Sequence, residues 1–174
     1  AVCPLPAPPA WKTLAAKVPV VSKRCDLCDV GQRKVLVEIL AEEKPDLVIN
    51  NAGAGMYGSV VEHDIEEHMA LVALNVAAVT ELTIESVRIM QHEGGGTVMN
   101  ISSVAAFFPF PYFSVYAATK AYVNSFSEAV DVEVASSGVR VLAACPGRVA
   151  THFGMRASKG FKKEKSSPSF FVMD

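Results

Sequence analysis

The sequence lacks a dominant charge of either sign. It holds 16 Lys and Arg residues against 18 Asp and Glu residues, a net charge of −2. This balance argues against a protein built to bind nucleic acid or an anionic membrane. No uninterrupted apolar run reaches the roughly 20 residues that span a bilayer. The first ten residues carry no basic segment ahead of an apolar stretch, so they do not resemble a signal peptide. These absences predict a cytoplasmic globular protein.

Cysteine is also scarce, and the few thiols set no obvious disulfide framework. Cys25 and Cys28 form a C-x-x-C pair within CDLCD, whereas Cys3 and Cys145 stand apart. A zinc site would need two further ligands at matching spacing, and a redox pair would need a low thiol pKa. We therefore expect ordinary half-buried cysteines and no bound metal. The histidines show no metal-ligand spacing either and are expected at the surface or at helix ends: His63, His68, His92 and His152.

What the sequence does contain is an alternation of apolar strands and periodic helices. Strands are predicted at 20–26, 46–50, 96–103 and 139–145, and helices at 30–44, 64–90 and 114–137. Continuous apolar strands separated by helices predict a parallel α/β sheet covered on both faces. No repeat or linker divides the chain, so we expect a single domain over 1–174, with residues 155–174 forming a mobile tail.

Two helices have a predicted buried face. Asp64 is the expected N-cap of the helix over 64–90, with Glu67 at the capping-box position. The residues spaced for a buried stripe in this helix are Met69, Val72, Val76, Val79 and Leu82. In the helix over 30–44 the corresponding face holds Val35, Leu36, Ile39 and Leu40.

The segment GAGMYG at 53–58 matches G-x-G-x-x-G, the dinucleotide-binding pattern. That pattern requires a helix to begin at its third glycine and an acidic residue to end a strand about 20 residues later. Here the predicted helix begins only at Asp64, and the later position falls inside that helix. GAGMYG is therefore not a pyrophosphate-binding loop.

Five elements in order instead resemble the short-chain dehydrogenase/reductase family. They are CDLCD at 25–29, NNAG at 50–53, Asn75 within LNV, Ser103 thirteen residues before the Y-x-x-x-K of Tyr116 and Lys120, and CPGRVAT at 145–151. The resemblance covers residues 22–151. It implies a Rossmann-like, doubly wound parallel sheet in three α/β/α layers, with the family's strand order 3-2-1-4-5-6-7.

The spacing of Tyr116 and Lys120 makes chemical sense. Residues i and i+4 lie on one helix face, and a nearby ammonium should lower the tyrosine pKa by about 1–3 units from about 10. A proton donor tuned in this way contributes about 10²–10⁴-fold to a rate. Ser103, at the end of a strand, can hydrogen-bond a substrate carbonyl, with Ser102 as the alternative. Asn75 is a misfit in a helix interior and calls for a reason.

The resemblance assigns the remaining roles. It implies that Asn75 anchors a water leading to Lys120 and that Lys120 also binds the nicotinamide ribose. The cofactor-binding residues that it implies are Asp26, Leu27, Asn51, Ala52, Gly53, Tyr116, Lys120, Val149 and Thr151. The cofactor is expected to be NADP, or NAD, because these residues do not distinguish the two.

The segment between Ser103 and Tyr116 is rich in aromatic residues. It holds five of the fourteen in the chain: Phe107, Phe108, Phe110, Tyr112 and Phe113. Such walls suit an apolar carbonyl substrate, such as a fatty acyl chain, a steroid-like ring or a lipid aldehyde. The alternative is that these rings pack the core or a subunit contact.

One family element has no counterpart in the sequence. The glycine-rich loop T-G-x-x-x-G-x-G is missing, together with the first strand, which would lie in the middle of the family's sheet, and the seventh strand. We expect that the chain omits residues at both ends, the alternative being a decayed copy. Two functions follow. One is an NAD(P)-dependent oxidoreductase that interconverts a carbonyl and a secondary alcohol, and the other is an inactive relative that acts as a binding or scaffold subunit. Either is expected to form a homodimer or homotetramer through helices 64–90 and 114–137.

Overall fold

The computed structural model describes residues 22–147 and Ala157. The strands are β1 (Leu47–Asn50), β2 (Gly96–Ile101) and β3 (Val139–Ala144). The α-helices are α2 (Val30–Glu43), α3 (Ile65–Val72), α4 (Val79–Glu93) and α5 (Ser114–Val134). A π-helix, η1 (Ala73–Ala78), joins α3 to α4, and two 3₁₀ segments are η2 (Val104–Phe107) and η3 (Ala135–Ser137).

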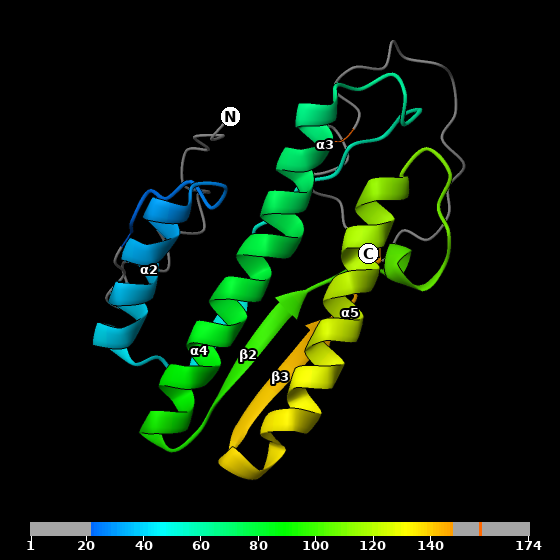
Figure 1. Ribbon diagram of the computed structural model, residues 1–174. Helices are drawn as coiled ribbons and strands as arrows, with labels where there is room; N and C mark the ends of the chain where they lie inside the picture. The colour runs from blue at the N-terminus through cyan, green and yellow to red at the C-terminus, as the bar shows by residue number, and fades with distance from the viewer. Residues whose placement is uncertain (1–21, 148–156, 158–174) are drawn as a thin grey trace, which may run out of the picture.

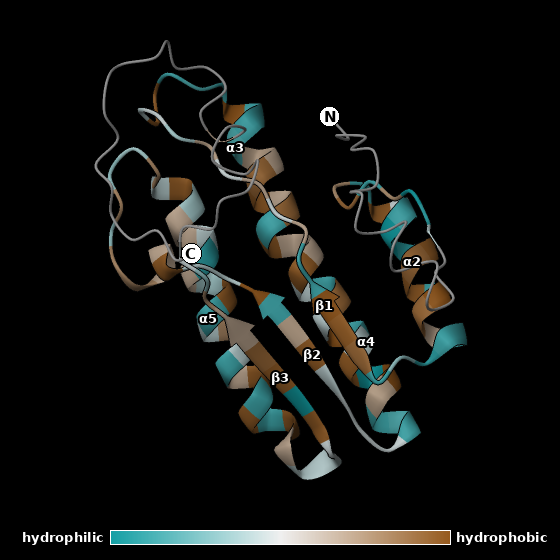
Figure 2. Ribbon diagram, turned by 180° about the vertical axis from the view of Figure 1, so that it is seen from behind, coloured by the Kyte–Doolittle hydropathy of each residue, from teal (hydrophilic) through white to brown (hydrophobic). Residues whose placement is uncertain are grey.

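The three strands form a parallel sheet in the order β1-β2-β3, as the alternating pattern predicts. Helices α4 and α5 cover one face, and α2 packs beside α4 (Figure 1). Seen from behind, the other face of the sheet carries no helix among the residues that the structure describes (Figure 2). The two-sided covering expected from the sequence is therefore visible here on one side only.

The predicted strand at 20–26 is wrong for its described part. Residues 22–26 have no strand conformation, and they turn onto the start of α2 instead, where the Asp26 amide donates to Gln32 Oε1 at 2.7 Å. A strand requires a neighbouring strand to accept its backbone hydrogen bonds. In the described sheet this segment pairs with none. Its hydrogen bonds go to side chains and to its own turn.

Residues 65–93 form one long helix interrupted by the π segment. Asp64 is its N-cap as predicted, but it makes no side-chain cap hydrogen bond, so the expected capping box is wrong. The predicted stripe is also wrong at Met69, which is 57% exposed. Val79 and Leu82 are buried as predicted, and Val72 and Val76 are half-buried. The other buried positions of the long helix are His68, Leu71, Asn75, Ala78, Thr83, Ser86, Val87 and Met90. A π turn takes in an extra residue, which shifts the buried face relative to a regular 3.6-residue period.

The main core lies between the sheet and helices α4 and α5. Its fully buried strand residues are Val98, Val139 and Val141, which pack with Val87, Met90 and Val134. A second cluster at the other end of α5 combines Leu71, Ala105, Tyr116 and Ala117. The glycine run after α4 allows a close backbone approach, because a Cβ on Gly95 would lie 2.8 Å from the Gly138 carbonyl oxygen.

Helix α2 is attached through a buried arginine rather than through the predicted apolar face. Arg33 forms an ion pair with Glu81 at 2.6 Å and donates to the Leu27 carbonyl at 2.7 Å. Val35 is exposed, whereas Leu36, Ile39 and Leu40 are half-buried. The prediction is therefore wrong for Val35 and holds in part for the other three.

The helix Ile65–Glu93 is long and apolar enough to cross a membrane by length and composition, among the helices searched within the described residues. Charged residues such as Glu81 and Arg88 interrupt it, in keeping with the absence of an uninterrupted apolar run from the sequence. The helix packs against β1, β2 and α5 and buries Leu71, Leu82 and Met90, whereas Ile65 and Met69 are exposed.

Candidate active site

The predicted catalytic residues lie at the edge of the sheet where the parallel strands end. Gly53 follows β1, Ser103 follows β2, and Tyr116 and Lys120 lie in the first two turns of α5. In open α/β sheets, ligands bind outside the carboxyl ends of the strands. The topology thus brings together residues that are up to 67 positions apart in the sequence, counted from Gly53 to Lys120.

Tyr116 is only 6% exposed and forms part of the second core cluster. Burial raises the pKa of its phenol, and a hydrogen bond with the Ser103 side chain partly offsets this effect. The predicted lowering of the Tyr116 pKa by Lys120 is therefore wrong in this structure. The ammonium lies 5.8 Å from the centre of the tyrosine ring, and the cost of removing the phenolate from water outweighs its attraction.

Lys120 is also buried, at 5% exposure. Its ammonium donates a hydrogen bond to the Ile101 carbonyl at 2.7 Å. Burial lowers the pKa of Lys120 to about 8, an effect that nearby Cys145 partly opposes. At neutral pH the side chain therefore still carries its charge, in a place where that charge is poorly solvated.

The two adjacent serines have different partners. The Ser102 hydroxyl donates to the Lys120 carbonyl at 2.9 Å, which ties the end of β2 to α5. The Ser103 hydroxyl accepts from the Ala105 amide at 3.2 Å and also bonds with Tyr116. Ser103 is thus the serine that lies beside the tyrosine.

Asn75 is completely buried in the π-helix. Its amide forms a closed pair of hydrogen bonds with the Ala54 backbone, at 3.0 Å and 2.9 Å, and also donates to Thr119 at 3.1 Å. The side chain therefore holds the loop after β1 against the helices. The sequence singled out Asn75 but did not foresee these partners.

Gly53 leaves an open backbone beside the candidate catalytic side chains of Asn75 and Lys120. A Cβ on this residue would lie 3.4 Å from both Asn75 Oδ1 and Lys120 Nζ. Asn51, Ala52 and Gly53 are exposed. These residues fit the close approach of a ligand such as a nucleotide cofactor, which a side chain at position 53 would obstruct.

The other predicted cofactor residues are less closely tied to this centre. Asp26 Oδ1 accepts from the Cys28 amide at 3.0 Å, and the Leu27 carbonyl accepts from Arg33, so both belong to a turn at the start of α2. This turn lies at the same end of the molecule as the carboxyl ends of the strands (Figure 1). Val149 and Thr151 lie outside the described residues.

A buried polar network beneath the site was not predicted. Asn100 Oδ1 accepts from Asn50 at 2.8 Å and from Thr83 at 3.0 Å, and Asn100 Nδ2 donates to Ser127 at 2.9 Å. The network joins β1, α4, β2 and α5. The sequence signal for this network is Asn100, a polar residue in the otherwise largely apolar strand β2, because a buried amide requires hydrogen-bond partners.

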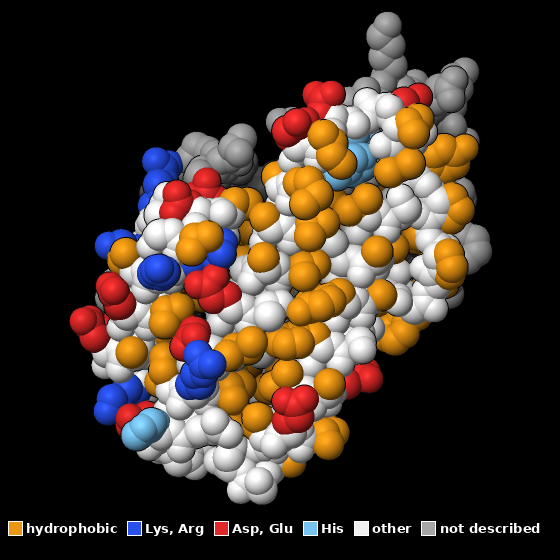
Figure 3. Space-filling view, viewed as in Figure 1, with side chains coloured by type: hydrophobic (Ala, Val, Ile, Leu, Met, Phe, Trp, Pro, Cys, Tyr) orange, Lys and Arg blue, Asp and Glu red, His pale blue; other side chains and the backbone are white. Residues whose placement is uncertain are grey.

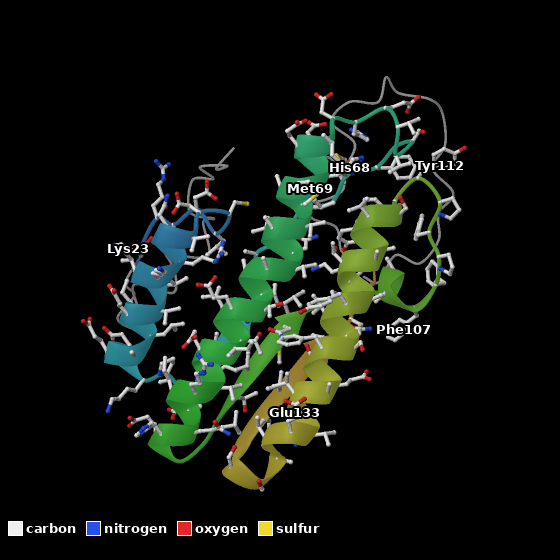
Figure 4. All side chains as sticks on the ribbon, viewed as in Figure 1. Lys23, His68, Met69, Phe107, Tyr112 and Glu133 are labelled. Carbon is white, nitrogen blue, oxygen red and sulfur yellow. The ribbon has the colours of Figure 1, made fainter. Side chains whose placement is uncertain are left out.

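The aromatic segment lies beside Tyr116 and largely faces solvent. Phe107 is 67% exposed and Tyr112 is 60% exposed, whereas Phe113 is half-buried. Figure 4 shows Tyr112 and Phe107 on the loop before α5, with His68 at the start of the neighbouring α3. Among the described residues these rings are thus not packed into the main core.

The cysteines and histidines depart from expectation at two positions. Cys25 and Cys145 are half-buried as expected, whereas Cys28 is exposed. Burial, followed by nearby Asp26, raises the pKa of both Cys25 and Cys28, which argues against a reactive thiol pair. His68 lies in the first turn of α3, as the helix-end alternative predicts, but it is buried rather than at the surface, with Nε2 2.9 Å from the Val60 carbonyl oxygen. The loop 57–64 folds back over α3 and encloses it.

The chain belongs to the short-chain dehydrogenase family, whose profile matches residues 8–161. It is 30% identical over 142 residues to a 3alpha-hydroxysteroid dehydrogenase of Mediterraneibacter gnavus, a match that covers 80% of this chain and 57% of the relative. The chain therefore spans less than two thirds of the relative's length.

Solved structures agree with this assignment. A short-chain dehydrogenase from Sphingobium yanoikuyae in complex with NADPH has a TM-score of 0.78 and 30% identity, covering 84% of this chain and 58% of that one. The bulky-bulky ketone specific alcohol dehydrogenase from Comamonas testosteroni has a TM-score of 0.73 and 30% identity, with coverages of 80% and 57%. The Rossmann-like α/β fold predicted from the sequence is confirmed.

Proposed function

We propose that this protein is an NAD(P)-dependent oxidoreductase that interconverts a carbonyl and a secondary alcohol. The observation that carries this proposal is the meeting of Tyr116, Ser103 and Lys120 at the carboxyl edge of the sheet. A phenol that is buried beside a serine hydroxyl and an ammonium is suited to transferring a proton to an oxygen atom.

Each of the three side chains has a separate task. The Tyr116 hydroxyl gives its proton to the carbonyl oxygen during reduction and takes it back during oxidation. The Ser103 hydroxyl donates a hydrogen bond to the same oxygen and stabilises the charge that develops there. The Lys120 ammonium, 5.8 Å from the centre of the tyrosine ring, would hold the nicotinamide ribose of the cofactor beside the phenol.

The cofactor would be held by the exposed backbone of residues 51–53, by Lys120 and by the turn at Asp26 and Leu27. It supplies the hydride acceptor or donor when bound. We propose NADP, with NAD as the alternative, since the Sphingobium yanoikuyae neighbour holds NADPH and a Brucella melitensis reductase holds NADH. Asn75 supports this site indirectly by fixing the loop that follows β1.

We propose a bulky apolar ketone or alcohol as substrate. The Phe113 ring stacks on Tyr116, and the exposed rings of Phe110 and Phe108 continue outward from it as an apolar wall. Two similar proteins are named for substrates of this kind, a 3alpha-hydroxysteroid and bulky-bulky ketones. A fatty acyl or other lipid carbonyl fits the same wall.

We further propose a single domain that assembles as a homodimer or homotetramer. Hydrophobic side chains gather over α4 and α5 (Figure 3). A groove between these helices is lined by Ile84, Phe126 and Val130, and an exposed apolar groove of this kind favours burial against a second copy.

The test compares two tyrosines of the same helix. Tyr116→Phe should reduce kcat with NADPH and a bulky apolar ketone by about 10²–10⁴-fold while leaving NADPH affinity within about threefold. Tyr122→Phe is the matched control, because Tyr122 is exposed on α5, where it stacks on Phe126 and shares a hydrogen bond with Thr80. Turnover should be unchanged in that variant.

Two results would contradict the proposal. Turnover that survives Tyr116→Phe would remove the tyrosine from the chemistry. A natural full-length protein that binds neither NADPH nor NADH in calorimetry would instead support the inactive binding subunit.

A further inference from the structure

Phe113 makes the closest aromatic contact recorded for the catalytic tyrosine. Its ring lies 4.3 Å from the ring of Tyr116, centre to centre, with an angle of 28° between the planes. This is a stacked pair on consecutive turns, since residues i and i+3 meet at the start of a helix. Phe113 is the residue before the first turn of α5, so its position depends on the loop as well as on the helix.

The loop fixes Phe113 through its backbone. The Phe113 amide donates to the Phe110 carbonyl at 3.1 Å, and the Phe113 carbonyl accepts from the Ala117 amide at 2.9 Å. The preceding residue, Tyr112, has a φ of 62°, a left-handed conformation that is uncommon for a tyrosine. Such a conformation persists only where its surroundings hold it in place.

A second loop, at residues 57–58, contacts the turn at Tyr112 and Phe113. The Gly58 amide donates to the Tyr112 carbonyl at 2.7 Å, and the Tyr57 ring meets Phe113 edge-on at 6.0 Å. Phe110 meets Phe113 edge-on as well, at 5.8 Å. The ring that stacks on Tyr116 is therefore itself enclosed by two aromatic edges.

We propose that Phe113 is a positioning residue for the reaction: its ring holds the phenol of Tyr116 in the orientation for proton transfer and keeps water from one side of it. This inference rests on the proposed function of Tyr116. The same ring packs in the cluster with Leu71, Ala105 and Ala117, while Ser103 bonds with its hydroxyl and the Lys120 ammonium is 5.8 Å from the ring centre. Phe113 adds a stacked aromatic face to these contacts.

The expected effect has two parts. Without Phe113, the tyrosine ring can tilt, and misplacement of a reacting group costs up to about 100-fold in rate. Water would also reach the phenol, which stabilises the phenolate and lowers the pKa of Tyr116. A residue with a merely structural role would change stability but would not move this pKa.

The experiment uses the full-length natural protein with tyrosine labelled at Cζ, whose NMR shift reports ionisation of each phenol. Tyr116→Phe identifies the Tyr116 signal among those of the other tyrosines. In Phe113→Ala we expect the pH midpoint of Tyr116 ionisation to fall. The pH above which kcat for ketone reduction declines should fall with it, and kcat itself should drop about 10–100-fold. The KM for NADPH should stay within about twofold.

Two further variants keep the test decisive. Phe113→Leu preserves an apolar cover, so it should fold and keep the Tyr116 midpoint near that of the parent protein while losing part of kcat. Tyr122→Ala removes an exposed ring of α5 that lies outside the substrate wall and stacks on Phe126, and it should change neither quantity.

An unchanged Tyr116 midpoint and a kcat within twofold in Phe113→Ala would overturn the inference. Failure of the proposed function is recognised separately, by turnover that survives Tyr116→Phe. The NMR midpoint reports on Phe113 in either case, because it does not depend on a substrate.

Discussion

Replacing Lys120 with methionine should separate the stability of this protein from its activity. Lys120 is 5% exposed, and burial lowers its pKa from about 10.5 to about 8. A difference of one pKa unit corresponds to about 1.4 kcal/mol, so keeping this ammonium charged inside the fold costs about 3 kcal/mol at neutral pH. Methionine has a similar length and carries no charge.

The sign of the pH dependence follows from the two pKa values. Below pH 8 the lysine is charged in both the folded and the unfolded state, and the whole cost is present. Between pH 8 and about 10.5 the unfolded chain binds more protons than the folded one, so the stability of the parent protein rises with pH through this site. Above that range the side chain is neutral in both states and the cost is gone.

The assay is urea unfolding of the parent protein and Lys120→Met, followed by circular dichroism between pH 7 and pH 10.5. The free energy of unfolding of Lys120→Met, relative to the parent, should decrease by about 3 kcal/mol across this range. Loss of the hydrogen bond to the Ile101 carbonyl changes the difference in free energy of unfolding by an amount that does not depend on pH. A difference between the two proteins that stays flat with pH would refute the reasoning, whatever its size. Turnover should be lost in this variant at every pH.

Three other predictions concern cofactor binding at Gly53, the attachment of α2 and the oligomeric assembly. Gly53→Ala should raise the Kd for NADPH about tenfold in calorimetry with little change in melting temperature, because its methyl group would lie 3.4 Å from Lys120 Nζ; unchanged affinity would contradict the cofactor fit. Arg33→Met should destabilise the protein by about 3 kcal/mol in urea unfolding, since it leaves Glu81 without its partner. The control, Arg88→Met, breaks an exposed pair and should cost less than about 1 kcal/mol, so equal losses would argue against the buried pair. Phe126→Asp should shift the oligomer to monomer in sedimentation; an unchanged oligomer would place the interface elsewhere.

Much of the candidate site could be predicted because it depends on local spacing. The i, i+4 relation of Tyr116 and Lys120 is a property of any helix, so the two side chains share a face as expected. The apolar runs also predict the two strands that lead to Gly53 and Ser103. The parallel order of the strands then brings these loops to one edge.

Other features depend on contacts between distant segments and could not be predicted. The π turn moved the buried face of the long helix, because an extra residue enters where Asn75 binds the Ala54 backbone. The burial of His68 depends on a loop that folds back over it, and the burial of Arg33 depends on Glu81, which is 48 positions away.

The alternation of helices and strands from α2 to β3 and the residue types at the candidate site follow from the sequence, because residue type and periodicity are local properties. The environment of those residues depends on the tertiary structure. The pKa of Tyr116 rises and that of Lys120 falls because the fold removes both from water. Solvation is a property of the packed surroundings as a whole, and no local spacing specifies it.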